Sequence, residues 1–164
     1  MPFAPCQTVT FGYFTLFCLF LNGIPILFYV NLVTMASIFT RIIQGEIPAH
    51  KVYEDDQYLA FLDISPLTEG HTLVVPKKEV DYIFDLDDDT LTGLMLVAKK
   101  LAPAIQKACP CLRIGVSVIG LEVPHTHVHL IPMQSMRDMN FSNPKLQFSP
   151  DELAATASRI RANV

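Results

Sequence analysis

The stretch "VPHTHVHLIP", residues 123–132, places three histidines at strict two-residue spacing in a mainly apolar segment. The chain has only 5 histidines in 164 residues, so most of its imidazoles gather here. Successive side chains of a β-strand point to opposite faces. A strand here therefore puts His125, His127 and His129 on one face, about 6.5–7 Å apart, with the residues between them facing the core.

Three interpretations fit the histidine spacing. An exposed polar face explains alternation, but it does not explain three identical titratable groups. Neutral imidazole is a common metal ligand, and His71, His50 or an acidic residue can complete a site begun by this strand. An imidazole nitrogen is also a good nucleophile towards phosphorus, and flanking histidines can orient it and supply protons. The spacing alone leaves the two chemical interpretations open.

The bulk composition indicates one domain and excludes a strongly basic nucleic-acid binder. The 164 residues carry a net charge of −4 and a sequence pI of about 5.6. The 4 cysteines lack the spacing of a disulfide scaffold. Cys109 and Cys111 flank a proline and are expected to stay reduced, since two thiols this close rarely form an unstrained bridge. Cysteine usage therefore favours a reducing, cytoplasmic compartment.

The first 40 residues contain no Asp, Glu, Lys, Arg or His. Residues 11–33 form an apolar run long enough to span a bilayer, but Asn, Gly and Pro interrupt its middle and no positive charge precedes it. Met35 opens "MASIFTRIIQGEIP", which is typical of the beginning of a small soluble domain. Residues 1–34 are therefore interpreted as an uncharged apolar extension: a misplaced upstream start, a membrane anchor, or a signal or packed arm.

The rest of the chain alternates helix-like and strand-like segments. Pro103 is expected to kink or split the longest helix, and Ser149 to cap the last one. Residues 112–120 look like a buried strand. Helices are predicted over 37–46, 85–109 and 149–162, and strands over 50–56, 58–65, 70–77, 112–120 and 125–132. This order predicts an α+β domain with a mainly antiparallel sheet.

Several motifs together resemble the histidine triad (HIT) family. His125 to Ile131 matches the family signature His-φ-His-φ-His-φ-φ, where φ is apolar, except that Thr126 fills the first φ position. "IFTRIIQGEIPAHKVYEDDQYLAFLDISPLTEGHTLVVPKK", residues 38–78, resembles the N-terminal half of these domains almost without gaps. The resemblance covers about residues 36–135 and predicts one HIT domain over residues 35–164.

The resemblance implies an α+β fold with a five-stranded antiparallel sheet per subunit, one long helix and short flanking helices. It implies a homodimer whose two sheets join, and a site that binds purine nucleotides without a metal or other cofactor. Members hydrolyse or transfer at the α-phosphate through a nucleotidyl-histidine intermediate. By position His127 is then the nucleophile, and His125 and His129 fix its tautomer and bind phosphate oxygens. His71 joins them from a neighbouring strand.

The resemblance also implies a set of nucleotide contacts. Asp63 matches the acid that binds both ribose hydroxyls, and a carboxylate with two acceptor oxygens suits a cis-diol. Asp63 can instead cap a turn before Pro66, and any one apolar position can be ordinary core. The apolar positions around the base are Ile38, Phe39, Ile42, Ile47, Phe61 and Ile64, and Glu122 and Val123 join the site ahead of the triad.

The sequence departs from the family pattern at two places. Many members carry Asn-x-Gly and then Gly-Gln before the triad. Here Val118 occupies the position of the Asn, Leu121 the position of the Gln, and Glu122 a position that is often Ser. These changes put the rate and the leaving-group preference in doubt. Some bacterial relatives bind structural zinc through Cys-x-x-Cys and a histidine, positions held here by Ser37, Thr40 and Glu79. These are poor zinc ligands, so zinc of that type is not expected.

The predicted function is a hydrolase or transferase of a purine nucleoside phosphoramidate. The alternatives are a dinucleoside polyphosphate hydrolase, a nucleotide-binding regulator without useful catalysis, and a metal-binding histidine strand. A cytoplasmic homodimer is expected, with no nucleic-acid partner and with a membrane only if residues 11–33 are a genuine segment. The Met-rich residues 133–141 are expected either over the site or at the dimer interface.

Overall fold

The computed structural model describes the chain over residues 9–11, 14–21, 24–31 and 36–164. The chain divides into two compact units, residues 1–35 and 36–164, and each is described by itself. The predicted boundary at Met35 lies outside the described residues.

The apolar N-terminal run consists of strands where the structure describes it. They form an antiparallel sheet in the order β1-β2-β3, with bounds Val9–Phe11, Phe14–Leu21 and Ile24–Asn31. Within the described ranges, no helix has the length and apolarity that crossing a membrane requires. The three interpretations of residues 1–34 stay predictions.

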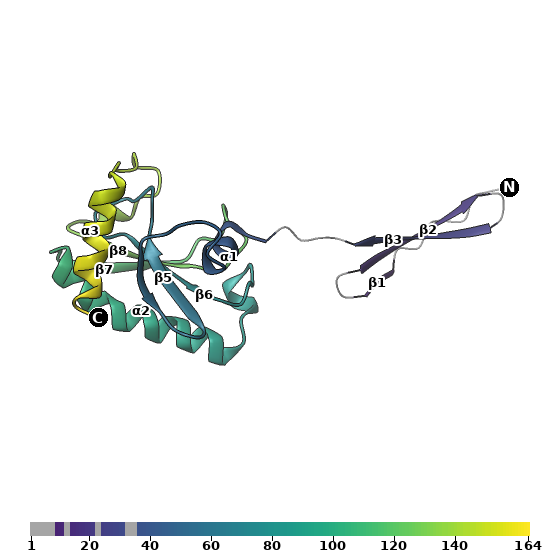
Figure 1. The fold of residues 1–164 in the computed structure, drawn as a ribbon, viewed down its shortest axis with the longest axis horizontal. Coiled ribbons are helices and arrows are strands. Elements are labelled where there is room, and N and C mark those ends of the chain that lie inside the picture. The colour runs from purple at the N-terminus through teal and green to yellow at the C-terminus, as the bar shows by residue number, and fades with distance from the viewer. Residues whose placement is uncertain (1–8, 12–13, 22–23, 32–35) are drawn as a thin grey trace. The chain divides into compact units, whose positions relative to one another are not determined.

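The second unit has the predicted α+β architecture, with a five-stranded antiparallel sheet, one long helix and shorter flanking helices (Figure 1). The strands, in spatial order, are β4 (Lys51–Glu54), β5 (Tyr58–Leu62), β6 (Thr72–Pro76), β8 (Val128–Met133) and β7 (Arg113–Ser117). The helices are α1 (Ile38–Ile43), α2 (Asp88–Ala108) and α3 (Pro150–Arg161), with 3-10 turns η1 (Ile83–Asp85) and η2 (Met136–Met139).

The two faces of the sheet carry different apolar clusters, and strand alternation sorts the residues between them. From β5, Tyr58, Ala60 and Leu62 join the cluster beneath α2 and α3, whereas Leu59 and Phe61 join the cluster beside α1. In β8, Val128 and Leu130 likewise belong to the α2 cluster. Since His129 lies between them, its side chain points to the α1 face, where the site forms.

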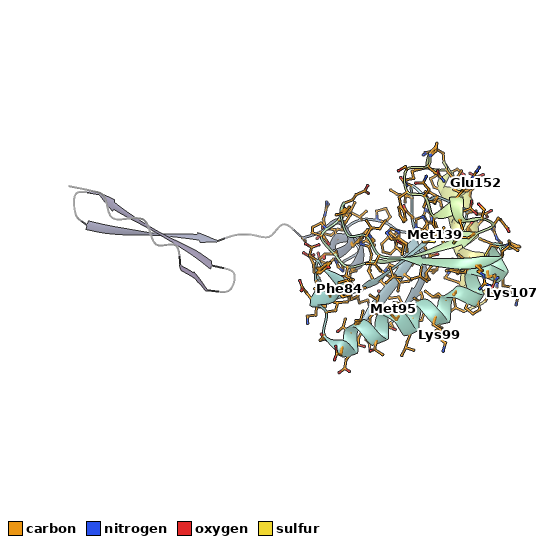
Figure 2. The ribbon with its side chains drawn as sticks, turned by 180° about the vertical axis from the view of Figure 1, so that it is seen from behind. Phe84, Met95, Lys99, Lys107, Met139 and Glu152 are labelled. Carbon is orange, nitrogen blue, oxygen red and sulfur yellow. The ribbon has the colours of Figure 1, made fainter. Side chains whose placement is uncertain are left out.

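Local sequence signals set the helix ends. Ser37, Asp87 and Ser149 cap α1, α2 and α3 by accepting a backbone N–H, and Ser149 forms a capping box with Glu152. Pro103 does not split α2, contrary to the expectation. The helix continues because Leu101, Ala104 and Ile105 around the exposed proline are held in the core. Figure 2 labels Met95 and Lys99 along this helix.

Two strand predictions need correction. Residues 112–120 were expected as a buried strand, but β7 lies at the sheet edge and Val116 is 50 % exposed. The histidine strand starts later than expected, because β8 begins at Val128. The backbone before it leaves the ladder, since Thr126 N–H donates to the Val80 carbonyl at 2.7 Å instead of to β6.

Candidate active site

His127 is held with one ring nitrogen free. Its Nδ1 lies 2.7 Å from the His125 carbonyl oxygen, which can only accept, so Nδ1 carries the proton and Nε2 keeps its lone pair. Nε2 has no hydrogen-bond partner among the described residues. Among the described residues, Thr68 Oγ1 is the only side-chain nitrogen or oxygen that is both fully buried and without a hydrogen-bond partner. Because His127 Nε2 also has no partner and is not such an atom, it reaches the surface. Although His127 is only 6 % exposed, its lone pair is therefore accessible.

His71 and His129 form a second, directional pair. The Leu67 N–H donates to His71 Nδ1 at 3.2 Å, so the proton of His71 is on Nε2. That Nε2–H donates to His129 Nδ1 at 3.0 Å, which places the His129 proton on its own Nε2. The backbone of Leu67 thus fixes the tautomers of both rings. The His129 ring, which carries this N–H, lies next to the His127 ring, since the two ring centroids are 4.8 Å apart.

The pair is neutral at physiological pH. Burial, together with smaller contributions from Lys145 and His127, lowers the pKa of His71 from 6.5 to about 4. Burial also lowers the pKa of His129 to about 3, with further contributions from His71 and His127. Neutral rings fit the hydrogen bonds from Leu67 to His71 and from His71 to His129, because a neutral imidazole has one donor nitrogen and one acceptor nitrogen.

His125 has no free nitrogen. Its Nε2 donates to the Pro76 carbonyl at 2.8 Å, and its Nδ1 therefore accepts from the Ser37 hydroxyl at 2.9 Å. Burial lowers the pKa of His125 as well. The expectation that His125 binds phosphate oxygens does not fit these contacts. Its contribution is positional, through the carbonyl that it offers to His127.

Asp63 makes the expected turn cap and keeps its other carboxylate oxygen open. Its Oδ1 accepts the Ser65 N–H at 2.8 Å, which makes the predicted turn cap. Its Oδ2 lies 3.6 Å from His71 Nδ1, beyond hydrogen-bond distance, and that nitrogen carries no proton because it accepts from Leu67. The Asp63–His71 contact is therefore not an ion pair. Oδ2 remains open on a side chain that is 20 % exposed.

The predicted base contacts divide into two groups. Phe39, Ile42, Ile47, Phe61 and Val123 meet in the apolar cluster on the α1 face. The Phe39 ring packs edge-on against Phe61 at 5.5 Å and against His127 at 5.1 Å, which joins this cluster to the histidines.

Other predicted positions lie outside that cluster. Ile38 is 47 % exposed and Ile64 is 70 % exposed, so neither contributes to it. Glu122 is exposed and makes no hydrogen bond or ion pair with any described residue.

Two residues of the site, Phe141 and Lys145, belong to no recognisable sequence motif. The Phe141 ring packs edge-on against His129 at 5.0 Å and His71 at 6.5 Å. Lys145 Nζ donates to the Phe141 carbonyl at 2.9 Å and lies 5.3 Å from the centre of its ring. The Leu146 N–H donates to the Pro66 carbonyl at 2.9 Å, so this segment is tied to the turn that follows Asp63. Only the tertiary contact identifies Phe141 and Lys145.

The Met-rich segment lies partly beside the site. Met139 of η2 (Figure 2) and Met133 of β8 fill the space in front of Gly115, which leaves no room for a side chain there. Phe141 at the end of the segment covers the histidine pair. The Met-rich segment was expected either over the site or at the dimer interface, and Phe141 lies over the site.

One group of potential metal ligands occurs among the described residues, at Asp63, His71 and His129, whose ligand atoms lie within 4.8 Å of one another. Both nitrogens of His71 and Nδ1 of His129 already take part in hydrogen bonds. The positions that hold zinc in some bacterial relatives also do not fit a zinc ion. Ser37 and Thr40 are hydroxyls that bond to Glu79 and to His125 instead.

Comparisons with known proteins agree with this geometry. The HIT domain family model matches residues 44–136. An uncharacterised HIT-like protein of Borreliella burgdorferi is 36 % identical over 135 residues, which cover 77 % of this chain and 97 % of that protein. An adenosine 5'-monophosphoramidase of Schizosaccharomyces pombe is 31 % identical over 132 residues, 79 % of this chain and 99 % of that protein.

The solved structures include a Hit-like protein of Bartonella henselae, described as involved in cell-cycle regulation and bound to an unknown ligand. It is 35 % identical, superimposes with a TM-score of 0.69, and the match covers 78 % of this chain and 96 % of that chain. With its five-stranded sheet, its three aligned histidines and these relatives, the chain belongs to the histidine triad (HIT) family.

Proposed function

We propose that the protein hydrolyses purine nucleoside phosphoramidates at the α-phosphate, with His127 as the nucleophile. The observation that carries this proposal is the tautomer of His127. The His125 carbonyl holds the proton on Nδ1, so the accessible Nε2 presents a lone pair. The activity named for the fission yeast relative supports the same substrate class.

The reaction proceeds in two balanced displacements. Nε2 of His127 forms a bond to phosphorus as the phosphorus–nitrogen bond to the leaving group breaks, and the leaving nitrogen takes one proton from solvent and departs as an amine. Water then attacks phosphorus, the bond to His127 breaks, and its electron pair returns to Nε2. Water loses one proton in this step, which balances the proton taken up before. The His129 N–H is placed to donate to a phosphate oxygen in both steps.

The same geometry orients the nucleotide. The base lies against the apolar cluster at Phe39 and Ile42, and the open Oδ2 of Asp63 accepts from the ribose. Phe141 and Lys145 border the His71–His129 side, where the positive charge of Lys145 favours an anionic phosphate. No metal ion is needed for these steps.

Two other functions remain testable at this site. A dinucleoside polyphosphate hydrolase requires only a different leaving group at the same phosphorus. A non-catalytic regulator is favoured by the departures at Val118, Leu121 and Glu122, because Leu121 and Glu122 are exposed and offer no neutral hydrogen-bond donor side chain to a phosphate.

The test is AMP release from an adenosine phosphoramidate and from a diadenosine polyphosphate, each with and without a chelator. Release from the phosphoramidate that is insensitive to chelation is expected. His127→Ala and His127→Gly should reduce turnover by at least about 10³-fold and leave AMP binding within a few-fold of wild type. His50→Ala is the matched control, since His50 lies outside the hydrogen-bonded histidines, and it should retain full activity.

Other outcomes would contradict the proposal in different ways. Turnover that survives in His127→Ala excludes the covalent route. Loss of activity on chelation indicates the metal interpretation. Tight AMP binding with no release from either substrate indicates the regulator. Rapid denaturation of the wild-type reaction at alkaline pH, where a phosphorus–nitrogen bond to histidine is stable, followed by intact-mass measurement should reveal a nucleotidyl adduct, and its location on a residue other than His127 would also refute the mechanism.

We also propose a homodimer formed through β7. This edge strand leaves one row of backbone N–H and C=O groups without a neighbouring strand, and the exposed Val116 lies on it. Pairing with a second copy would continue the sheet to ten strands. Light scattering should give twice the chain mass, and Val116→Glu should shift it towards the single chain. A single-chain mass for the wild type would contradict the dimer.

We propose a cytoplasmic, reducing compartment because Cys109 and Cys111 are not joined in a disulfide. Cys109 and Cys111 are free thiols, and burial raises the pKa of Cys109, which keeps it protonated. Fractionation of cells that produce the native chain, combined with mass spectrometry of its N-terminus, tests both the compartment and the predicted start at Met35.

A further inference from the structure

One hydroxyl connects helix α1 to the first histidine of the triad. Ser37 is 6 % exposed, and its Oγ accepts the Thr40 N–H at 3.1 Å, which caps α1. The same Oγ lies 2.9 Å from His125 Nδ1. Because His125 Nε2 donates to the Pro76 carbonyl, Nδ1 is an acceptor and the Ser37 O–H is the donor. The Ser37 hydroxyl thus accepts a hydrogen bond from the helix backbone and donates one to His125.

A carboxylate holds this hydroxyl in place from the other side. Glu79, which follows β6, accepts the Ser37 N–H at 3.1 Å and also the Thr40 hydroxyl. The Thr40 hydroxyl is itself 3.3 Å from His125 Nδ1. These hydrogen bonds lower the pKa of Glu79, the largest contribution coming from Thr40, so Glu79 is ionised and remains an acceptor. Ser37 is therefore fixed at both its backbone and its side chain.

The network reaches the proposed nucleophile through the backbone. Both ring nitrogens of His125 are bonded, and the ring is fully buried, so this residue has one position. Its carbonyl oxygen is the acceptor for His127 Nδ1–H at 2.7 Å. The Ser37 hydrogen bond is one of the two side-chain restraints on the residue that carries this carbonyl, and the Pro76 carbonyl provides the other. The orientation of His127 and the position of its proton thus depend on the bonds made by Ser37.

We infer that Ser37, anchored by Glu79, is a positioning residue that holds His127 in its nucleophilic tautomer by way of His125. This inference rests on the proposed function for its effect on turnover. The same residues cap α1, which carries Phe39 and Ile42, so the base-binding cluster and the nucleophile share one anchor.

Ser37 both caps α1 and donates a hydrogen bond to His125, and a substitution by glycine distinguishes these two roles. Glycine at an N-cap costs little compared with serine, whereas it removes the donor to His125 completely. Ser37→Gly should therefore lower kcat by about 3- to 10-fold, the range expected for the loss of one hydrogen bond, and change KM by less than about twofold. Ser37→Thr keeps the hydroxyl and should restore most of kcat.

Histidine nitrogen NMR provides a readout that does not need turnover. In the nucleotide-free wild type, His125 should show a protonated Nε2 and a hydrogen-bonded, unprotonated Nδ1. The Nδ1–H of His127 should exchange slowly with water. In Ser37→Gly the His125 Nδ1 resonance should move and the His127 proton should exchange at least about 10-fold faster, because its acceptor is no longer fixed.

Ser149→Gly is the matched control. Ser149 caps α3 through the same kind of bond, to the Glu152 N–H, and contacts no histidine. It undergoes the same chemical change and should leave kcat and both histidine signals as in the wild type. Glu79→Gln keeps an acceptor oxygen for Ser37 and should behave more like the wild type than Glu79→Ala.

Three results would overturn the inference. The first is a Ser37→Gly protein whose histidine signals match the wild type. The second is a fall in kcat no larger than that of Ser149→Gly. The third is one zinc ion per chain in protein purified without chelator and lost in Ser37→Gly, since Nδ1 of His125 would then be a metal ligand. If the wild type itself releases no AMP, the proposed function fails, while the NMR comparison still decides the role of Ser37.

Discussion

His71 Nε2 donates to His129 Nδ1 at 3.0 Å, although the two residues lie 58 positions apart in the chain. The bond forms because His71 directly precedes β6 and His129 is in β8, and these strands are neighbours in the sheet. The Leu67 N–H at the far nitrogen of His71 gives the pair a direction. A backbone amide outside the triad therefore decides which nitrogen of His129 carries the proton.

The first prediction concerns stability against pH. The pKa of His71 falls to about 4 and that of His129 to about 3 in the folded protein, both from 6.5. Below pH 6.5 the unfolded chain binds protons that the folded chain does not, so the free energy of unfolding decreases as the pH falls. The loss should run from about pH 6.5 down to about pH 3–4 and level off below. For His71 alone it amounts to roughly 3 kcal/mol.

Urea unfolding at several pH values between 7 and 4 measures this loss. The proton resonances of the two rings provide an independent check, because neither should titrate above about pH 5. A midpoint near 6.5 for either ring would contradict the neutral, buried pair.

The second prediction concerns recognition of the sugar. Asp63→Asn retains an oxygen that can accept from Ser65 N–H, so the turn is kept. The charge that strengthens the ribose contact is lost, and KM for a ribonucleoside phosphoramidate should rise about 10-fold with a smaller change in kcat. The wild type should discriminate against a 2'-deoxy substrate more strongly than the variant does. Equal discrimination by both proteins would show that Asp63 acts only as a turn cap.

The third prediction concerns Phe141, which covers the histidine pair. Phe141→Ala removes the ring that packs at 5.0 Å from His129 and admits water to both imidazoles. The pKa of His129 and of His71 should then rise towards the ordinary value, because burial is the main cause of their depression. NMR titration of the two rings measures the shift. Phe141→Leu, which preserves most of the cover, should shift them less, and unchanged titration in Phe141→Ala would contradict the role of the ring.

The fourth prediction concerns packing of α2 on β5. A Cβ on Gly93 would collide with the hydroxyl end of Tyr58, which donates to the Thr90 carbonyl at 3.0 Å. Gly93→Ala should therefore destabilise the protein by about 1–3 kcal/mol, although alanine is the better helix former. In the background of Tyr58→Phe the same change should cost less, because the nearest atom is gone. Strictly additive effects of the two substitutions in urea unfolding would show that they do not touch.

The sequence predicted much of the fold because its signals are local. Ser149 caps the last helix as predicted, and the strand predicted over residues 58–65 contains β5. It did not predict that residues 113–117 form an exposed edge, because strand order depends on long-range pairing. Nor did it predict that α2 continues through Pro103, since packing of the neighbouring residues holds the helix together.

The sequence by itself placed His125, His127 and His129 at alternate positions, which lie on one face of an extended chain. In the structure only His129 of the three belongs to strand β8. The sequence also identified the family and therefore the chemistry to expect. Only the tertiary structure decided the separate roles of the three rings. A proton on imidazole follows the nearest acceptor or donor. For His125 these partners are Pro76 and Ser37, and for His129 the partner is His71, all of which folding brings from distant parts of the chain.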